Sequence, residues 1–197
     1  MSAPIWIRGR AWEANSYVIG NILVDAAVPL DKIEPFKEDI DTVVITHGHF
    51  DHIANAENIC KACGAKLFIG ECDMPFLRDE SLSLSAHFLM KNPHVAAEPL
   101  ADGARVGEFC VYHTPGHTQG SICLFREDDG VLISGDTVFP NGSYGRTDLP
   151  TGSDSDMRAS LARLAALSVE SIWPGHDMPV PEGGRRHVLL SQSEANR

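Results

Sequence analysis

The stretch that decides the fold is Thr46-His47-Gly48-His49-Phe50-Asp51-His52, in which four of seven side chains can bind a metal. It follows Thr42–Ile45, an apolar and mostly β-branched run that predicts a buried strand. After it, apolar residues recur at helical spacing from Ile53 to Cys63. The stretch therefore lies where a strand ends and a helix begins, a place from which loops can direct ligands toward one site.

Three further potential metal ligands follow other predicted strands. Each comes after a hydrophobic run and beside a glycine: His117 within Thr114–Thr118, Asp136 within Ser134–Thr137, and His176 within Trp173–Asp177. Zinc and similar ions need about four nitrogen, oxygen or sulfur ligands, so one stretch alone does not complete a site. One histidine after one strand is ordinarily a hydrogen-bonded loop residue. Five histidines and two aspartates at four strand ends instead predict a site for two metals that share a carboxylate.

These motifs carry a family resemblance when they are taken together. The order is His-x-His-x-Asp-His, Pro-Gly-His-Thr-x-Gly-Ser, Gly-Asp-Thr and Pro-Gly-His, spread from about Asn15 to His176. This pattern resembles the metallo-β-lactamase superfamily. The segment from Gly135 to Pro150 is similar to that of the short, single-domain members of the hydroxyacylglutathione hydrolase (glyoxalase II) group.

The resemblance implies an α/β (α+β) fold, a four-layer αβ/βα sandwich of two mixed β-sheets flanked by helices. Periodicity alone predicts only strands and helices in one domain. We expect a single domain over residues 1–197, because the tail after Pro179 is too short for another. The C-terminal helical domain with which two-domain glyoxalase II enzymes hold glutathione has no counterpart here, so another thiol is an open alternative.

The resemblance also implies a division of the metal ligands. The first metal would be held by His47, His49 and His117, and the second by Asp51, His52 and His176, with Asp136 bridging them. Asp25 matches a position that supports the metal histidines in the family, and an ordinary turn aspartate is the alternative. Two divalent ions are expected, with zinc favoured and iron or manganese also compatible with these donors.

The activity implied by the resemblance is hydrolysis of a small-molecule thioester, of the hydroxyacylglutathione type, by a hydroxide that bridges the metals. Asp51 is expected to orient this nucleophile or to handle its proton. Arg146 would either receive an anionic part of the substrate or pair with Asp148, two residues away in the same loop. Tyr144 is expected to line the mouth of the site.

Two other classes of function compete with the thioester hydrolase. Persulfide dioxygenases resemble this chain too, and they bind one iron through two histidines and one carboxylate. Those enzymes typically carry a cysteine where Tyr144 precedes Gly145, which favours the hydrolase. The remaining alternatives are hydrolysis of another ester or a lactone, and a metal-binding module without catalysis.

Charge and apolar composition indicate which binding partners and which cell compartment to expect. The net charge is −11 with a pI near 5.1, and without a long basic stripe nucleic-acid binding is not expected. The start lacks a basic segment followed by an apolar one, and no run reaches the ~20 apolar residues of a membrane span. We therefore expect a cytoplasmic monomer or homodimer that binds no membrane.

Five cysteines are expected to be free thiols, with Cys60 and Cys63 on the core side of one helix.

The other elements follow from local patterns. Apolar runs predict strands over 5–7, 16–19, 22–25, 66–69, 104–106, 109–113, 121–125, 131–134 and 171–173. Helices are expected over 30–40, from Ile53 to Cys63, and after an N-cap at Ser153. Residues 72–90 predict an irregular helical segment that either covers the sheet or forms a wall of the substrate cleft.

Overall fold

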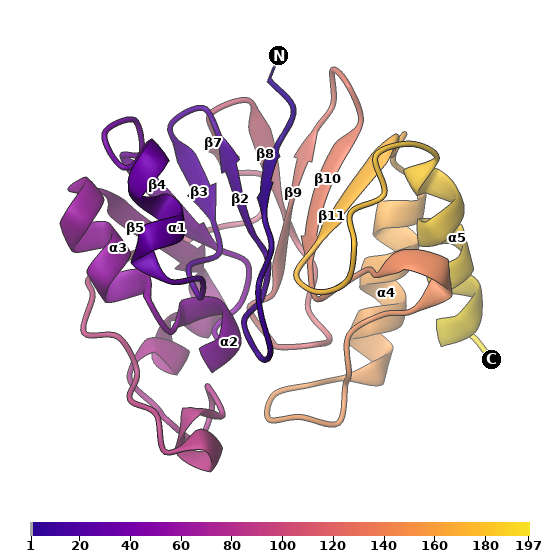
Figure 1. Cartoon of the computed structure of the whole chain (residues 1–197). Helices are drawn as coiled ribbons and strands as arrows, with labels where there is room; N and C mark the ends of the chain where they lie inside the picture. The colour runs from indigo at the N-terminus through magenta and orange to yellow at the C-terminus, as the bar shows by residue number, and fades with distance from the viewer. Residues whose placement is uncertain (1) are drawn as a thin grey trace. The chain divides into compact units, whose positions relative to one another are not determined.

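The computed structural model describes residues 2–197. The chain divides into two compact units, the first ending at Pro99 and the second running from Leu100 to Arg197. Each unit is built on one β-sheet with its own helices, which are labelled in Figure 1. The one-domain organisation expected from the sequence stays a prediction.

The first sheet is mixed and has the strand order β1-β2-β3-β4-β5-β6. Its strands are β1 (Ile5–Ile7), β2 (Ser16–Ile19), β3 (Ile22–Val24), β4 (Thr42–Ile45), β5 (Lys66–Gly70) and β6 (Ala97–Leu100). The first three pair antiparallel, whereas β3, β4 and β5 pair parallel. Because parallel strands end at the same edge, the residues that follow Val24, Ile45 and Gly70 are brought close together.

The helices of the first unit are shorter than the sequence predicts. The expected helix over 30–40 is a four-residue α1 (Leu30–Ile33) followed by the 3₁₀ helix η1 (Glu34–Phe36), which holds Pro35. Where one helix is expected from Ile53 to Cys63, the chain forms two, α2 (Phe50–Ile53) and α3 (Ala56–Cys63). Asn55 separates them, because its backbone and side-chain amides donate to Ala26 and Ala27 carbonyls instead of continuing a helix.

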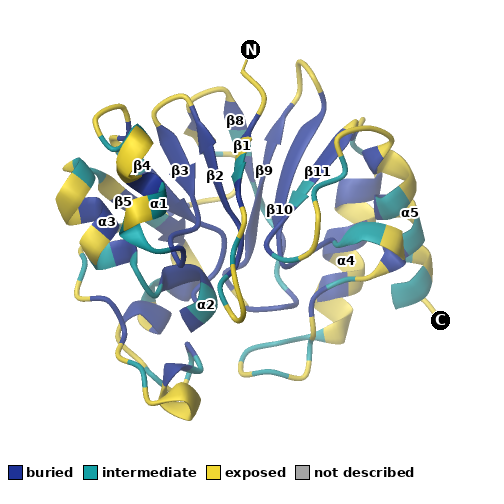
Figure 2. Ribbon diagram, in the orientation of Figure 1, coloured by how far each residue is buried: buried dark blue, intermediate teal, exposed yellow. Residues whose placement is uncertain are grey.

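Residues 72–90 are irregular, as expected, and contain only 3₁₀ helices. These are η2 (Glu71–Leu77) and η3 (Ser85–Phe88). The core of the unit lies between the sheet and helices α1, α2 and α3, and Figure 2 shows strands β2 and β3 as buried. Cys60 belongs to this core and burial raises its pKa to about 11, so its thiol stays protonated at neutral pH.

The second sheet is also mixed and has the order β11-β10-β9-β8-β7. Its strands are β7 (Arg105–Val106), β8 (Phe109–His113), β9 (Ile122–Arg126), β10 (Val131–Gly135) and β11 (Ser171–Pro174). Strand β9 runs antiparallel to both neighbours, and β10 pairs parallel with β11. Strands β8, β10 and β11 therefore point the same way, and the turns after them meet at one edge.

Two long helices pack on this second sheet, α4 (Asp154–Ala165) and α5 (Gly184–Ala195). In Figure 1 they lie side by side, and the 3₁₀ helix η4 (Pro140–Gly142) contacts α5. The predicted cap is confirmed, because the Ser153 hydroxyl accepts a hydrogen bond from the Asp156 amide. The shared core contains Leu132 of β10, Leu161 of α4 and Val188 of α5.

Two mixed sheets flanked by helices confirm the predicted α/β fold class. None of the helices within residues 2–197 is long and apolar enough to cross a membrane.

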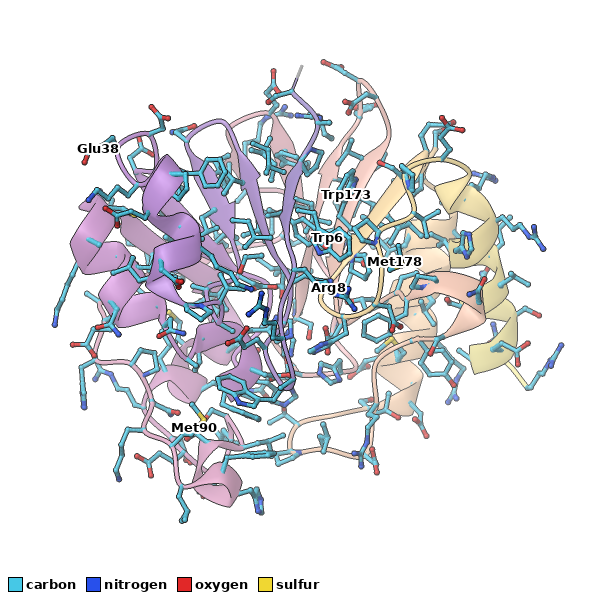
Figure 3. The ribbon with its side chains drawn as sticks, in the orientation of Figure 1. Trp6, Arg8, Glu38, Met90, Trp173 and Met178 are labelled. Atoms are coloured by element: carbon cyan, nitrogen blue, oxygen red, sulfur yellow. The ribbon has the colours of Figure 1, made fainter. Side chains whose placement is uncertain are left out.

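Strand β1 is an edge strand of the first sheet, and Figure 3 labels Trp6 and Arg8 on this part of the chain. The Arg8 guanidinium carbon lies 6.0 Å from the centre of the Trp6 ring, a cation–π contact.

Candidate metal centre

His47 and His49 face each other at the end of strand β4. Nε2 of His47 lies 3.0 Å from Nδ1 of His49, and both side chains are buried. Two nitrogens bound to one tetrahedral zinc at 2.0–2.1 Å would be about 3.3 Å apart. The pair is a hydrogen bond when one nitrogen is protonated, and its spacing also suits two ligands of one ion.

His52 is oriented by Asp25, which follows strand β3. The Asp25 Oδ2 atom lies 2.8 Å from His52 Nδ1, and Asp25 also accepts from the Thr46 amide and hydroxyl. A carboxylate on one imidazole nitrogen fixes the tautomer and directs the other nitrogen toward a metal. The role that the resemblance suggested for Asp25 is the one that this geometry favours over an ordinary turn.

We expect Asp25→Asn to weaken metal binding by about 10–100-fold without unfolding the protein, because it removes the charge that holds the His52 imidazole. Asparagine suits the position, since Asp25 has a φ of 58° and asparagine tolerates left-handed backbone. Competition with a chelator measures the affinity. Asp31→Asn, at an exposed site in α1, is the matched control, and equal affinities of both variants would refute the role of Asp25.

The turn between the two histidines depends on residues that the sequence analysis missed. The Gly48 amide donates to Oδ2 of Asp73 over 2.8 Å, and Asp73 is fully buried in η2. A Cβ on Gly48 would lie 2.2 Å from Cβ of Phe76, so no larger residue fits. Asp73 comes soon after β5, as Asp25 comes directly after β3. An aspartate that follows a parallel strand is the sequence pattern by which Asp73 could have been found.

Asp51 lies in the first turn of α2 and is half-buried. Its carbonyl accepts a hydrogen bond from the Ala14 amide over 2.9 Å, which ties α2 to the segment before β2. An acidic residue suits the first turn of a helix, although a helix of four residues has only a small dipole. Its roles as ligand and proton carrier stay predictions.

In the second unit, Asp136 stands between two histidines. Its Oδ2 atom lies 3.7 Å from His117 Nε2 and 3.6 Å from His176 Nε2. Asp136 follows β10 and His176 follows β11, so the parallel pairing of Gly135 with Pro174 places both at one edge. A carboxylate oxygen equally far from two imidazole nitrogens fits a ligand shared by two cations.

His117 is held from the other side of its ring. Its Nδ1 atom lies 2.7 Å from the Arg146 carbonyl oxygen, so Nδ1 carries the proton and Nε2 is left as the ligand atom. The turns that carry His117 and Asp136 are joined by the Thr114 and Thr137 hydroxyls, 3.1 Å apart. The second unit thus arranges three of the predicted donors without contributions from the first.

The predicted substrate residues take structural positions. The Arg146 guanidinium makes a two-pronged ion pair with Asp148, at 2.9 and 2.8 Å, and both side chains are exposed. This hydrogen-bonded pair holds the pKa of Asp148 below its ordinary value. Tyr144 bridges to Val138 and packs against the core under α4 and α5. Contacts of Arg146 or Tyr144 with a substrate stay predictions.

The donor set fits divalent metals. Each of the grouped histidines and aspartates offers one ligand atom, a ring nitrogen or a carboxylate oxygen. Zinc, iron and manganese all bind sets of imidazole and carboxylate ligands. Cysteine is absent from these groups, which excludes a thiolate site of the structural zinc type among the described residues.

Comparison with known proteins identifies the family. The sequence model of the Metallo-beta-lactamase superfamily matches residues 9–176, and the chain belongs to this superfamily. It is 31% identical over 189 residues to a probable metallo-hydrolase of Methanocaldococcus jannaschii, covering 86% of this chain and 90% of that one. It is 36% identical over 152 residues to an uncharacterised protein of Aquifex aeolicus, covering 73% and 71%.

Solved structures agree with this assignment. The crystal structure of TTHA1623 in a di-iron-bound form matches with a TM-score of 0.81 and 26% identity, over 96% of both chains. The BLEG-1 B3 metallo-beta-lactamase matches with a TM-score of 0.82 and 23% identity, over 96% of this chain and all of that one. The second likeness shows the fold alone.

Proposed function

We propose that this protein is a metal-dependent hydrolase that cleaves a small-molecule thioester, of the hydroxyacylglutathione type. The observation that carries the proposal is Asp136, whose one carboxylate oxygen lies at equal distance from two imidazoles. Relatives described as probable metallo-hydrolases, in Methanocaldococcus jannaschii and Bacillus subtilis, support the hydrolase class.

The proposed ligand sets are those that the family resemblance implies. One ion would be held by His47, His49 and His117, the other by Asp51, His52 and His176, and Asp136 would contact both. Two divalent ions held there would supply charge that polarises a carbonyl and lowers the pKa of a coordinated water from 15.7 toward about 7. Zinc is the favoured ion, and iron or manganese suits the same donors.

The protein's own residues would prepare the donors before a substrate arrives. Asp25 and the Arg146 carbonyl set the tautomers of His52 and His117, so their free nitrogens need no reorganisation. Asp73 fixes the turn at Gly48 and thereby the spacing of His47 and His49. Asp51, at the start of α2, would orient the attacking water or accept its proton.

A thioester suits a site without an evident general acid. Thiols have pKa values near ~8.5, so a thiolate can leave without being protonated first. An alkoxide leaving group has a far higher pKa and would need a proton donor. The proposed partners are therefore small thioesters, with neither nucleic acid nor membrane involved.

The second candidate is a persulfide dioxygenase with one iron. The solved relative in a di-iron-bound form makes iron a real alternative to zinc. His117, Asp136 and either His47 or His49 would supply the two-histidine, one-carboxylate set. Tyr144 in place of the typical cysteine favours the hydrolase.

The deciding experiment is metal analysis of protein purified without added metal, paired with two assays. We expect about two metals per chain and hydrolysis of S-lactoylglutathione without oxygen uptake. One iron per chain with oxygen consumption on glutathione persulfide would establish the dioxygenase instead. A fully metallated sample without turnover of thioesters, esters or lactones would reject catalysis.

Arg146→Ala tests the predicted substrate role of Arg146. We expect KM for an anionic thioester to rise with little change in kcat, because binding in the ground state is lost. The carbonyl that holds His117 belongs to the backbone and remains. Asp148→Asn, which removes the pairing partner but keeps the cation, is the control. A lower Tm with unchanged KM in Arg146→Ala would limit Arg146 to pairing with Asp148.

A further inference from the structure

A row of aromatic rings lies beside the histidine turn of the first unit. The Trp12 and Phe50 ring centres are 5.4 Å apart, and Phe50 and Phe88 stack with centres 4.3 Å apart at an angle of 26°. Trp12 is 38% exposed, Phe88 55% and Leu89 95%, which is unusual for such large apolar side chains. We call Trp12, Phe50, Phe88 and Leu89 the aromatic surface.

The segment that carries Phe88 and Leu89 is firmly anchored by polar groups on its inner side. The buried Asn92 accepts from the Ser83 and Ser85 hydroxyls over 2.7 and 2.8 Å and donates to the Phe76 carbonyl over 2.7 Å. Polar side chains therefore face inward and apolar ones outward, the reverse of ordinary burial. A segment held this way presents its apolar residues to solvent as part of its structure.

Backbone strain is concentrated at the same place. Among the described residues with a positive φ other than glycine, the apolar ones are Ala11, Leu84 and Leu89, at 54°, 65° and 55°. Ala11 precedes Trp12, and the two leucines flank η3, which ends at Phe88. Left-handed backbone is unfavourable for such residues, and strain of this kind gathers at ligand-binding segments.

Hydrogen bonds join the aromatic surface to the histidine turn. Phe50 follows His49 directly, and its amide donates to the Ser83 carbonyl over 2.8 Å. Phe76, whose carbonyl is bound by Asn92, lies against Gly48, and its ring centre is 6.0 Å from that of His49. The exposed rings and two proposed metal ligands therefore belong to one connected piece of structure.

We propose that the aromatic surface binds the acyl group of the substrate, so that the preferred thioesters carry an aromatic ring or a comparably large apolar acyl group. This rests on the proposed function and names its substrate class. None of the four side chains is charged, so the surface suits an apolar group and offers nothing to the carboxylates of glutathione. Three exposed side chains are also far fewer than the roughly 20–30 residues that each partner gives to a stable interface.

The test compares two thioesters of the same thiol, S-phenylacetylglutathione and S-acetylglutathione. We expect the wild type to favour the phenylacetyl compound in kcat/KM. The double variant Phe88→Ser, Leu89→Asn should lower that preference about threefold to tenfold, the range expected for losing an aromatic contact. Its Tm should hold or rise, because asparagine relieves the left-handed strain at residue 89. Leu189→Ser, an exposed leucine of α5, is the matched control and should keep the preference.

Failure of the inference can be told from failure of the proposed function by a binding measurement. Calorimetry with the uncleavable thioether S-(2-phenylethyl)glutathione should show binding that the double variant loses. If both thioesters are hydrolysed and the double variant keeps the wild-type preference, the inference is wrong and the hydrolase stands. If neither is hydrolysed but thioether binding depends on the surface, the hydrolase is wrong and the acyl assignment falls with it, although the surface still binds apolar groups. Concentration-dependent dimers that the double variant abolishes, without thioether binding, would make the surface a subunit contact and overturn the inference.

Discussion

Asp136→Asn is expected to remove most of the thioester hydrolysis and at least one of two bound metals per chain. The Asp136 carboxylate is the donor proposed to contact both ions, and an amide nitrogen in its place repels a cation. Residues that only orient metal ligands contribute about 10–100-fold, so kcat/KM should fall by more than about 100-fold. Steady-state kinetics with metal analysis of the same sample measures both losses.

The same variant should lose the stabilisation that metal gives. An ion at 100 times its Kd stabilises the folded state by about 2.7 kcal/mol, which corresponds to a rise in Tm of about 5–11 °C for a chain of this size. We expect the full rise in the wild type and in Asp128→Asn, an exposed turn variant, but a smaller rise or none in Asp136→Asn. A full metal-dependent rise in Asp136→Asn would exclude Asp136 as a shared ligand.

The sequence predicted the donors because each belongs to a local pattern. A buried run, a tight turn and a histidine or aspartate can all be recognised within a few residues, as around His117 and His176. The Ser153 cap is equally local, and it is confirmed. Parallel pairing then brings such turns to one edge, which needs only the strand order.

Features that depend on distant partners were predicted less well. The helix after the histidine turn breaks at Asn55 because Ala26 and Ala27, far away in sequence, offer carbonyl acceptors. Asp73 has a sequence signal in its position after a strand, but its role becomes clear only with the Gly48 amide beside it. Helix α5 was not predicted, since its apolar residues become a core face only by packing against α4. Strand β6 was missed because Pro99 and Glu98 disfavour a strand in isolation.

Gly145→Ala is expected to disrupt the second unit's donors by adding one methyl group. An added Cβ would lie 2.0 Å from the Asp136 carbonyl oxygen and 3.0 Å from the His117 ring, and the backbone atom cannot move without moving Asp136. Overpacking of this kind costs about 1–3 kcal/mol. Displacing reacting groups by about 1 Å can cost 100-fold in rate, so kcat/KM should fall by about that factor.

The informative control for Gly145→Ala is Gly20→Ala, which separates lost stability from lost geometry. Gly20 has a φ of 59° and nothing within 4 Å of an added Cβ, so alanine there costs roughly 1–2 kcal/mol through backbone strain alone. Both variants should therefore have a lower Tm, but only Gly145→Ala should lose metal and activity. If the two lose activity in proportion to their stability, the close approach of Gly145 to Asp136 and His117 has no role in holding the donors.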